Sequence, residues 1–180
     1  MASKIKVDQL ETADGTGTIA LQNQLSGLTT ASLPTVTTDK LGTGAVLQVV
    51  HNSNIAAFTS TSTSLADTNY TISITPKSAS STIVVVFSGE WGTSGNGRSG
   101  MDIQTNSSGS YATIDGASNY FMWSEQYQCS MNTITAIETS IGTTNTVTYK
   151  ARARIISSGL TIYVPMDPFN SHAIAYEIAG

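Results

Sequence analysis

The chain has 180 residues, of which 39% are hydrophobic and only 11% charged, against about 25% charged in an average soluble domain. Hydroxyl side chains take the place of the missing charges, since the sequence contains 27 Thr and 24 Ser. The net charge of −4 argues against nucleic acid and anionic lipid as partners, and no apolar run is long enough to span a membrane. The single cysteine excludes a disulfide framework.

Residues 1–43 carry few large apolar side chains. Short strand patterns at Lys4–Leu10 and Thr18–Gln22 are separated by an Asp-Gly turn signal. Because an isolated two-stranded hairpin is marginal in water, the apolar side chains of this segment need partner surfaces for burial. We therefore predict an extended β/coil segment that oligomerises or anchors the chain through five side chains: Ile5, Val7, Leu10, Ile19 and Leu21.

Strand patterns follow in quick succession from residue 44 onward. Val46–Val50 comes first, and then Tyr70, Ile72 and Ile74 alternate with hydroxyl residues. The continuous apolar run Thr82–Phe87 predicts a strand that is covered on both faces. The clearest alternation is that of residues 147–155, and further strands are expected at 101–104, 120–123, 133–141, 160–164 and 172–178.

Helical patterns are almost absent, and only residues 65–67 and 136–140 suggest a helical turn. The Gly- and Ser-rich residues 89–100 are expected to form a surface loop. Eight to ten short strands predict an all-β fold, namely a two-sheet sandwich with the jelly roll as the leading arrangement. We thus expect two parts, an attachment segment at 1–43 and a jelly-roll-like head at 44–180.

Several short phrases carry a resemblance to a known family. They are ASKIKVDQL and GTGTI near the N-terminus, GAVLQVV at residues 44–50 and EIAG at residues 177–180. These phrases resemble parts of virion fibre-type structural proteins of tailed bacteriophages, especially phages of marine bacteria and cyanobacteria. The resemblance implies a homotrimer attached to the virion by its N-terminal segment, with a β-sandwich head that points outward. Residues 88–140 match no phrase of that family, and the linker here is shorter than the shaft such proteins often have.

Catalytic constellations are weak in this sequence. Ser171, His172 and Asp167 make a triad only on paper, because no Gly-x-Ser-x-Gly elbow is present. Cys129 is expected to be a buried, inert thiol, and His51 with His172 cannot make a His-rich metal site. We predict no enzyme activity, no cofactor and no metal, with calcium held by loop Asp and carbonyl groups as the alternative. The carboxylates occur at no spacing typical of a glycoside hydrolase: Glu90, Asp102, Asp115, Glu125 and Glu138.

Aromatic side chains near polar planar ones suggest a surface for a sugar or a protein. The alternative is that Trp91, Phe121 and Trp123 belong to the core of the sandwich or to packing along a trimer axis. The candidate contacts with a receptor or ligand are Trp91, Asn96, Arg98, Tyr120, Trp123 and Tyr127.

The sequence and the resemblance together predict a non-enzymatic virion structural protein, made in the host cytoplasm and exposed on the phage particle. Its expected partners are two further copies of itself, other virion proteins of the tail, neck or capsid, and a host-surface glycan or protein. Two alternatives stay open: a decoration or cement protein that stabilises the capsid shell, and a glycan-binding module with no role in adhesion.

Overall fold

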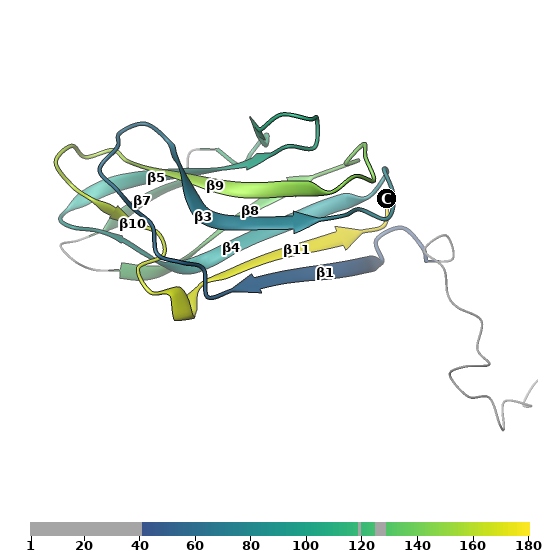
Figure 1. Ribbon diagram of the computed structural model, residues 1–180, viewed down its shortest axis with the longest axis horizontal. Helices are drawn as coiled ribbons and strands as arrows, with labels where there is room; N and C mark the ends of the chain where they lie inside the picture. The colour runs from purple at the N-terminus through teal and green to yellow at the C-terminus, as the bar shows by residue number, and fades with distance from the viewer. Residues whose placement is uncertain (1–40, 119, 125–128) are drawn as a thin grey trace, which may run out of the picture. The chain divides into compact units, whose positions relative to one another are not determined.

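A computed structural model describes residues 41–118, 120–124 and 129–180 (Figure 1). The five apolar side chains of the N-terminal segment and the candidate contact Tyr127 lie outside these residues, so the expectations for them stay predictions. The described residues all belong to one compact unit.

Two antiparallel sheets make up the described part of the chain (Figure 1). Sheet I has four long strands in the order β1-β11-β4-β8: β1 (Val46–Ser53), β11 (His172–Ile178), β4 (Thr82–Thr93) and β8 (Cys129–Glu138). Sheet II has four strands in the order β3-β9-β5-β7: β3 (Ala66–Ile74), β9 (Val147–Ile155), β5 (Gly97–Thr105) and β7 (Tyr120–Ser124). Three short strands extend the sheets: β10 (Ile162–Tyr163) and β2 (Thr59–Ser60) in sheet I, and β6 (Ala112–Thr113) in sheet II.

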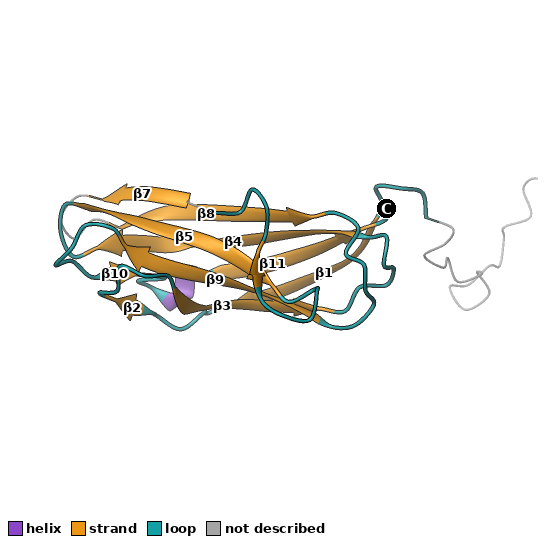
Figure 2. Cartoon of the chain, turned by 90° about the horizontal axis from the view of Figure 1, so that it is seen from above, coloured by secondary structure: helices purple, strands orange, loops and turns teal. Residues whose placement is uncertain are grey.

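The order of the long strands is that of a jelly roll. Along the chain these strands alternate between the two sheets, except that β5 and β7 follow one another in sheet II. Figure 2 shows the strands of both sheets lying roughly along the length of the sandwich. The predicted all-β sandwich with a jelly-roll arrangement is therefore confirmed.

The core lies between the sheets and follows the alternation of the sequence. In β9 every second residue is buried, from Val147 through Tyr149 to Ile155, and the residues between them face outward. The opposing residues of β4, Ile83, Val85 and Phe87, are fully buried as well. Period-two alternation thus places one set of side chains in the core and the other on the outer face of each sheet.

Two local expectations were wrong. The expected helical turns at 65–67 and 136–140 overlap strands β3 and β8, and the one helix among the described residues is a 3₁₀ turn at Pro168–Asn170. Its N-terminus is capped by Asp167, whose carboxylate accepts a hydrogen bond from the Phe169 amide at 2.9 Å. No helix in the described ranges has the length and apolar character needed to cross a membrane.

The expected surface loop at 89–100 is the second correction, because most of it belongs to β4 and β5. The glycines there permit close packing instead of flexibility. A Cβ on Gly89 would lie 1.9 Å from the hydroxyl of Tyr70, and one on Gly97 would lie 2.4 Å from a methyl group of Leu160. Only a short turn at residues 94–96 joins the two strands.

Tyr70 is the centre of a buried polar contact beside Gly89. Its hydroxyl donates to the Ser88 carbonyl at 2.9 Å and accepts from Nε1 of Trp91 at 3.2 Å. Burial raises the pKa of Tyr70 to about 12, although the hydrogen bond from Trp91 acts in the opposite direction. Tyr70 therefore stays neutral at physiological pH and fixes the position of Trp91 in the core.

The phrases GAVLQVV and EIAG are neighbours in space. The Gly44 amide donates to the Ala179 carbonyl and the Ala179 amide to the Ala45 carbonyl, both at 2.8 Å. Gln48 Nε2 donates to the carboxylate of Glu177 at 2.6 Å. The chain therefore enters the sandwich directly beside its C-terminus, and side chains from both phrases hold this junction together.

Glu177 is a fully buried carboxylate that organises the turn between β3 and β4. One of its oxygens accepts from the Lys77 amide and the Ser81 hydroxyl, each at 2.7 Å, and from the Ser78 amide at 3.3 Å. Burial alone would raise the pKa of Glu177, but these hydrogen bonds and the one from Gln48 lower it below its ordinary value. The charged form is thus the one that the fold stabilises.

Candidate ligand-binding face

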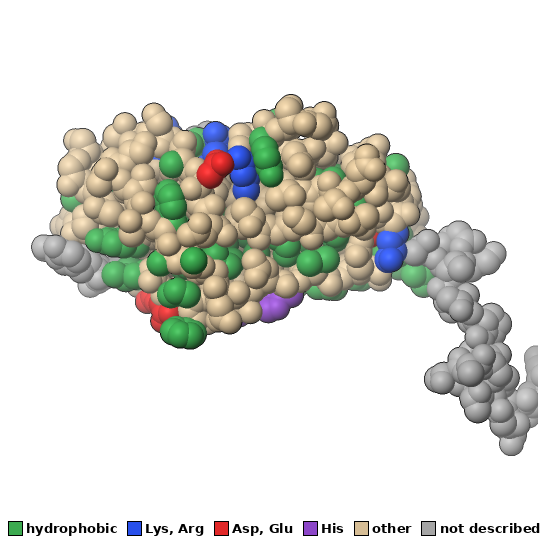
Figure 3. Space-filling model, in the orientation of Figure 1, with side chains coloured by type: hydrophobic (Ala, Val, Ile, Leu, Met, Phe, Trp, Pro, Cys, Tyr) green, Lys and Arg blue, Asp and Glu red, His purple; other side chains and the backbone are tan. Residues whose placement is uncertain are grey.

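Charged side chains gather on the outer face of sheet II (Figure 3). Four of the five Lys and Arg residues in the described ranges lie there, because β9 alternates between buried and outward positions and β5 contributes one more. They are Arg98, Lys150, Arg152 and Arg154. Figure 3 shows basic and acidic side chains together over β3 and β9.

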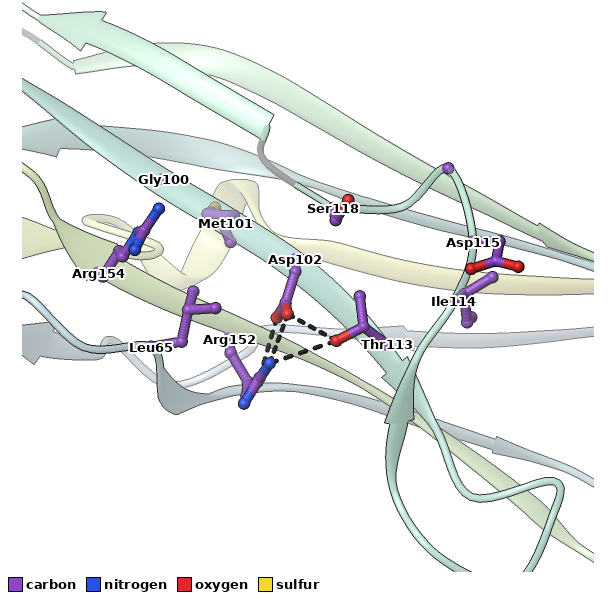
Figure 4. Close-up of a pocket in the computed structure, with 11 residues that line it drawn as sticks. Leu65, Gly100, Met101, Asp102, Thr113, Ile114, Asp115, Ser118, Arg152 and Arg154 are labelled. Carbon is purple, nitrogen blue, oxygen red and sulfur yellow. Dashed lines mark hydrogen bonds and ion pairs between the residues drawn. The ribbon is translucent and has the colours of Figure 1, made fainter.

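Two of these cations are neutralised by neighbouring carboxylates. Arg152 forms a two-pronged ion pair with Asp102, with Nε–Oδ1 at 3.0 Å and Nη2–Oδ2 at 2.5 Å, and Thr113 also donates to Asp102 (Figure 4). The hydrogen bonds to Asp102 raise the pKa of Arg152 further. Lys150 pairs with Asp67 at 2.7 Å, and its ammonium lies 3.9 Å from the centre of the Tyr111 ring.

Arg154 lies at the meeting point of two surface hollows. The first, of about 390 Å³, extends from Arg154 and Gly100 past Leu65 and Arg152 to Asp115 (Figure 4). The second, of about 430 Å³, is lined by Thr63, Arg98, Phe121, Arg154, Ile155 and Ile156. Gly100 pairs with Arg154 across the sheet, and a Cβ on Gly100 would be in van der Waals contact with Nε of Arg154 at 3.4 Å. Arg154 thus belongs to both hollows at once.

Two exposed aromatic rings lie on β7, and one of them, Phe121, lines the second hollow. In β7, Phe121 and Trp123 point outward and are 54% and 65% exposed. Phe121 pairs with Gly100 across the sheet and Trp123 pairs with Arg98. The guanidinium carbon of Arg98 lies 5.3 Å from the centre of the Phe121 ring, within the range of a cation–π contact. Flat apolar surface and planar hydrogen-bond donors are therefore adjacent here.

The predicted contact residues differ in their exposure to solvent. Arg98, Asn96 and Trp123 are exposed, whereas Tyr120 is half-buried and its hydroxyl donates to the Thr135 carbonyl. Trp91 is only 2% exposed, so its side chain is part of the core and not of an outer binding surface. It lines a hollow of about 310 Å³ together with Tyr120 and Phe121. The alternative assignment to the core of the sandwich is thus correct for Trp91 and wrong for Phe121 and Trp123, while packing of these two rings along a trimer axis stays a prediction.

Sequence reasoning missed Arg154 and did not select Phe121 as a contact. The alternation of residues 147–155 already placed Arg154 outward, on the same face as Arg152. The sequence alone gave no sign that Arg152 is paired with Asp102 while Arg154 is not, because that pairing depends on the register between β9 and β5.

Ser171, His172 and Asp167, which the sequence could combine into a triad, do not form one in the structure. The Ser171 hydroxyl donates to the Pro168 carbonyl and accepts from the Ile55 amide at 2.7 Å, and Asp167 caps the 3₁₀ turn. His172 lies beside His51, with Nδ1 of His172 and Nε2 of His51 3.2 Å apart. Each of the three side chains therefore has its own structural partner.

The remaining reactive groups also have structural partners. Glu138 accepts hydrogen bonds from the hydroxyls of Tyr149 and Ser107. Burial is the larger cause and the contact with Glu138 the smaller cause of the raised pKa of Tyr149. Cys129 is half-buried and not fully buried as expected. Burial and then the nearby Glu90 carboxylate raise the pKa of its thiol, which favours the unreactive protonated form. Across residues 41–118, 120–124 and 129–180, no three His, Cys, Asp or Glu side chains form a group that could hold a metal ion.

The outer face of sheet I has the opposite character. One row across its four strands consists of Val49, Tyr176, Val84 and Ile137, paired in register. Val49 is 53% and Ile137 56% exposed, and Val84 and Tyr176 are half-buried. The next row contributes Ile174 and Val86. Glu90 is the only Asp, Glu, Lys or Arg that the described strands place on this face.

The two outer faces therefore differ sharply, one apolar and nearly free of charge, the other rich in cations and exposed aromatic rings. Comparison of the whole chain with protein-family models and with curated proteins found no match.

Proposed function

We propose that the chain is a non-enzymatic structural protein of a tailed-phage virion, a fibre-type homotrimer anchored by residues 1–43 that displays the sandwich as its head. The observation that carries the proposal is the apolar outer face of sheet I, together with the resemblance of the phrases at both ends of the head. The head packs this face against sister copies and presents the charged face of sheet II to the host surface.

The sequence of β4 supports the role of the apolar face. The continuous run Thr82–Phe87 is typical of a strand covered on both sides, yet the described residues cover only its inner side. Full burial of each large apolar side chain contributes about 1.5–3 kcal/mol, so a row that crosses four strands favours association strongly. Three copies of this face arranged around a common axis match one another in polarity, whereas a charged partner finds almost no counter-charge there.

The junction at Gln48 and Glu177 supports the resemblance. The phrases GAVLQVV and EIAG contain the two side chains that join β1 to β11 where the chain enters the head. Their occurrence together therefore has a structural reason, since each phrase supplies one half of the same contact.

Replacing Ile137 with aspartate is expected to convert trimers to monomers, because three carboxylates would have to be buried in one apolar interface. The loss of apolar burial in three copies predicts assembly weaker by about 100-fold or more. Sedimentation velocity measures the change, and circular dichroism checks that the β signal is kept. Thr71→Asp, which adds a carboxylate at an exposed position of sheet II, is the matched control and should leave trimers intact.

The same measurement on Ile5→Asp with Val7→Asp tests the N-terminal contribution, and that variant is also expected to dissociate. Trimers that survive Ile137→Asp but not the N-terminal pair would place the assembly contact in residues 1–43 alone. A wild-type chain that sediments as a monomer at all concentrations would end the homotrimer proposal.

The position on the particle separates attachment from decoration. An attachment head predicts that residues 44–180 bind host cells and reduce infection when added in excess. A decoration protein predicts neither effect, and instead predicts binding of the full chain to empty shells. A particle reconstruction that shows where three copies share an axis would decide between them directly.

A further inference from the structure

We propose that the outer face of sheet II binds an acidic saccharide, whose carboxylate or sulfate group lies between Arg154 and Arg98 and whose ring packs on Phe121. This inference rests on the proposed function, because it names the class of host-surface ligand that the displayed head recognises.

The first argument is the distribution of charge. Lys150 and Arg152 each have a carboxylate partner, Asp67 and Asp102 respectively. Arg154 and Arg98 form no ion pair with any carboxylate of the described residues. Within the described residues, two guanidinium groups without a carboxylate partner thus line the same hollow, in a chain whose net charge is −4. This local excess of positive charge favours an anionic ligand at this place.

The second argument is the shape around Arg154. A guanidinium presents donors in a planar fork that matches a carboxylate or a sulfate. Arg154 lines both hollows, and its partner across the sheet, Gly100, lines the first of them. An anionic group bound at Arg154 therefore leaves room for a sugar ring on either side of it, along the outer face of the sheet.

The third argument is the mixture of apolar and hydroxyl surface. Phe121 offers an exposed ring for the apolar face of a sugar, and Trp123 lies next to Arg98 along the same edge. Thr63 lines the second hollow, and Ser118 and Asp115 line the first. In Figure 4, Asp115 lies at the opposite end of its hollow from Arg154, where a carboxylate can accept hydrogen bonds from sugar hydroxyls.

Charge and size favour a saccharide over nucleic acid. Nucleic acid requires many clustered cations along a phosphate backbone, and the described residues of this face offer only two guanidinium groups that are not paired with a carboxylate. Two hollows of about 390 and 430 Å³ suit individual sugar units of an oligosaccharide.

Calorimetric titration of the full chain tests the proposal, with three probes: an oligogalacturonate, whose anionic groups are carboxylates, a carrageenan oligosaccharide, whose anionic groups are sulfates, and neutral dextran. Binding of either acidic probe but not of dextran is the expected result, and the stronger of the two identifies the anionic group. The affinity is expected to fall with added salt. Equal binding of all three probes, or tighter binding of a DNA duplex of equal charge, would overturn the proposal.

Variants connect the binding to this face. Arg154→Gln is expected to raise the dissociation constant at least tenfold, and Arg154→Gln with Arg98→Gln to abolish binding. The matched control is Lys77→Gln, which removes the one described cation outside the face and should change the constant less than twofold. Equal effects of Arg154→Gln and Lys77→Gln would place the ligand elsewhere.

A measurement of adsorption to host cells distinguishes failure of the saccharide site from failure of the proposed virion function. A wild-type chain that forms trimers and adsorbs to cells, yet ignores both acidic probes, would refute the saccharide site and leave the attachment function standing. A chain that binds the acidic probe but neither trimerises nor associates with the particle would refute the virion role instead.

Discussion

Replacing Gly89 with alanine is expected to lower the free energy of unfolding by about 3 kcal/mol, because the new Cβ would lie 1.9 Å from the hydroxyl of Tyr70. Tyr70 is fully buried and its hydroxyl is held by the Ser88 carbonyl and Trp91, so the ring cannot move aside without loss of both hydrogen bonds. Urea denaturation measures the loss directly. Gly42→Ala is the matched control, since nothing lies within 4 Å of its Cβ, and it should change stability by less than about 0.5 kcal/mol.

A double-mutant cycle identifies the cause of this loss. In a Tyr70→Phe background the closest atom is gone, and the next atoms, Nε1 of Trp91 and Cζ of residue 70, lie 3.1 and 3.2 Å away. Gly89→Ala should therefore cost at least about 1 kcal/mol less in that background than in the wild type. The same cost in both backgrounds would show that the contact with the hydroxyl is not responsible.

Replacing Glu177 with glutamine is expected to cost about 2–4 kcal/mol at pH 7, because a buried carboxylate that accepts four hydrogen bonds is lost. The sign of the pH dependence follows from the lowered pKa of Glu177. Its contribution is fully present above the unfolded pKa of about 4.3 and is lost as the pH falls through the lower folded pKa. The difference in stability between wild type and variant should therefore be constant above about pH 6 and shrink below about pH 4.

Chemical denaturation between pH 3 and pH 8 measures that difference. Asp115→Asn is a suitable control, since Asp115 lies exposed in the turn after β6, and its effect should be within about 0.5 kcal/mol. A wild-type advantage that grows on acidification would contradict the assigned role of the Glu177 carboxylate.

Alternation explains why so much of the fold is predictable from the sequence. In β9 the alternation of apolar and polar residues from Val147 to Ile155 predicts which side chains enter the core and which face outward. The same rule, continued from Ile83 in steps of two, passes through Phe87 and Gly89 to Trp91 and places the tryptophan in the core. The expected loop at 89–100 was wrong because glycine and serine were taken as signs of a turn, whereas Gly89 makes space for Tyr70.

The candidate site is less predictable because it depends on contacts between distant strands. Arg152 and Arg154 have the same outward position in β9, and only the register with β5 gives Asp102 to one of them and Gly100 to the other. The exposure of Phe121 and Trp123 likewise depends on the position of β7 at the end of sheet II. The sequence of a short aromatic strand does not indicate whether that strand lies in the middle or at the edge of its sheet.

The turn held by Glu177 also bears on resistance to proteases. A trypsin-like protease cleaves after Lys and Arg, and the described residues contain five such positions. Arg98, Lys150, Arg152 and Arg154 lie in paired strands, and the Lys77–Ser78 bond lies in the turn whose two amides donate to Glu177. Cleavage at any of them requires local unfolding first. The same carboxylate that stabilises the junction thus holds closed the one cleavage site of the described residues that lies outside a strand.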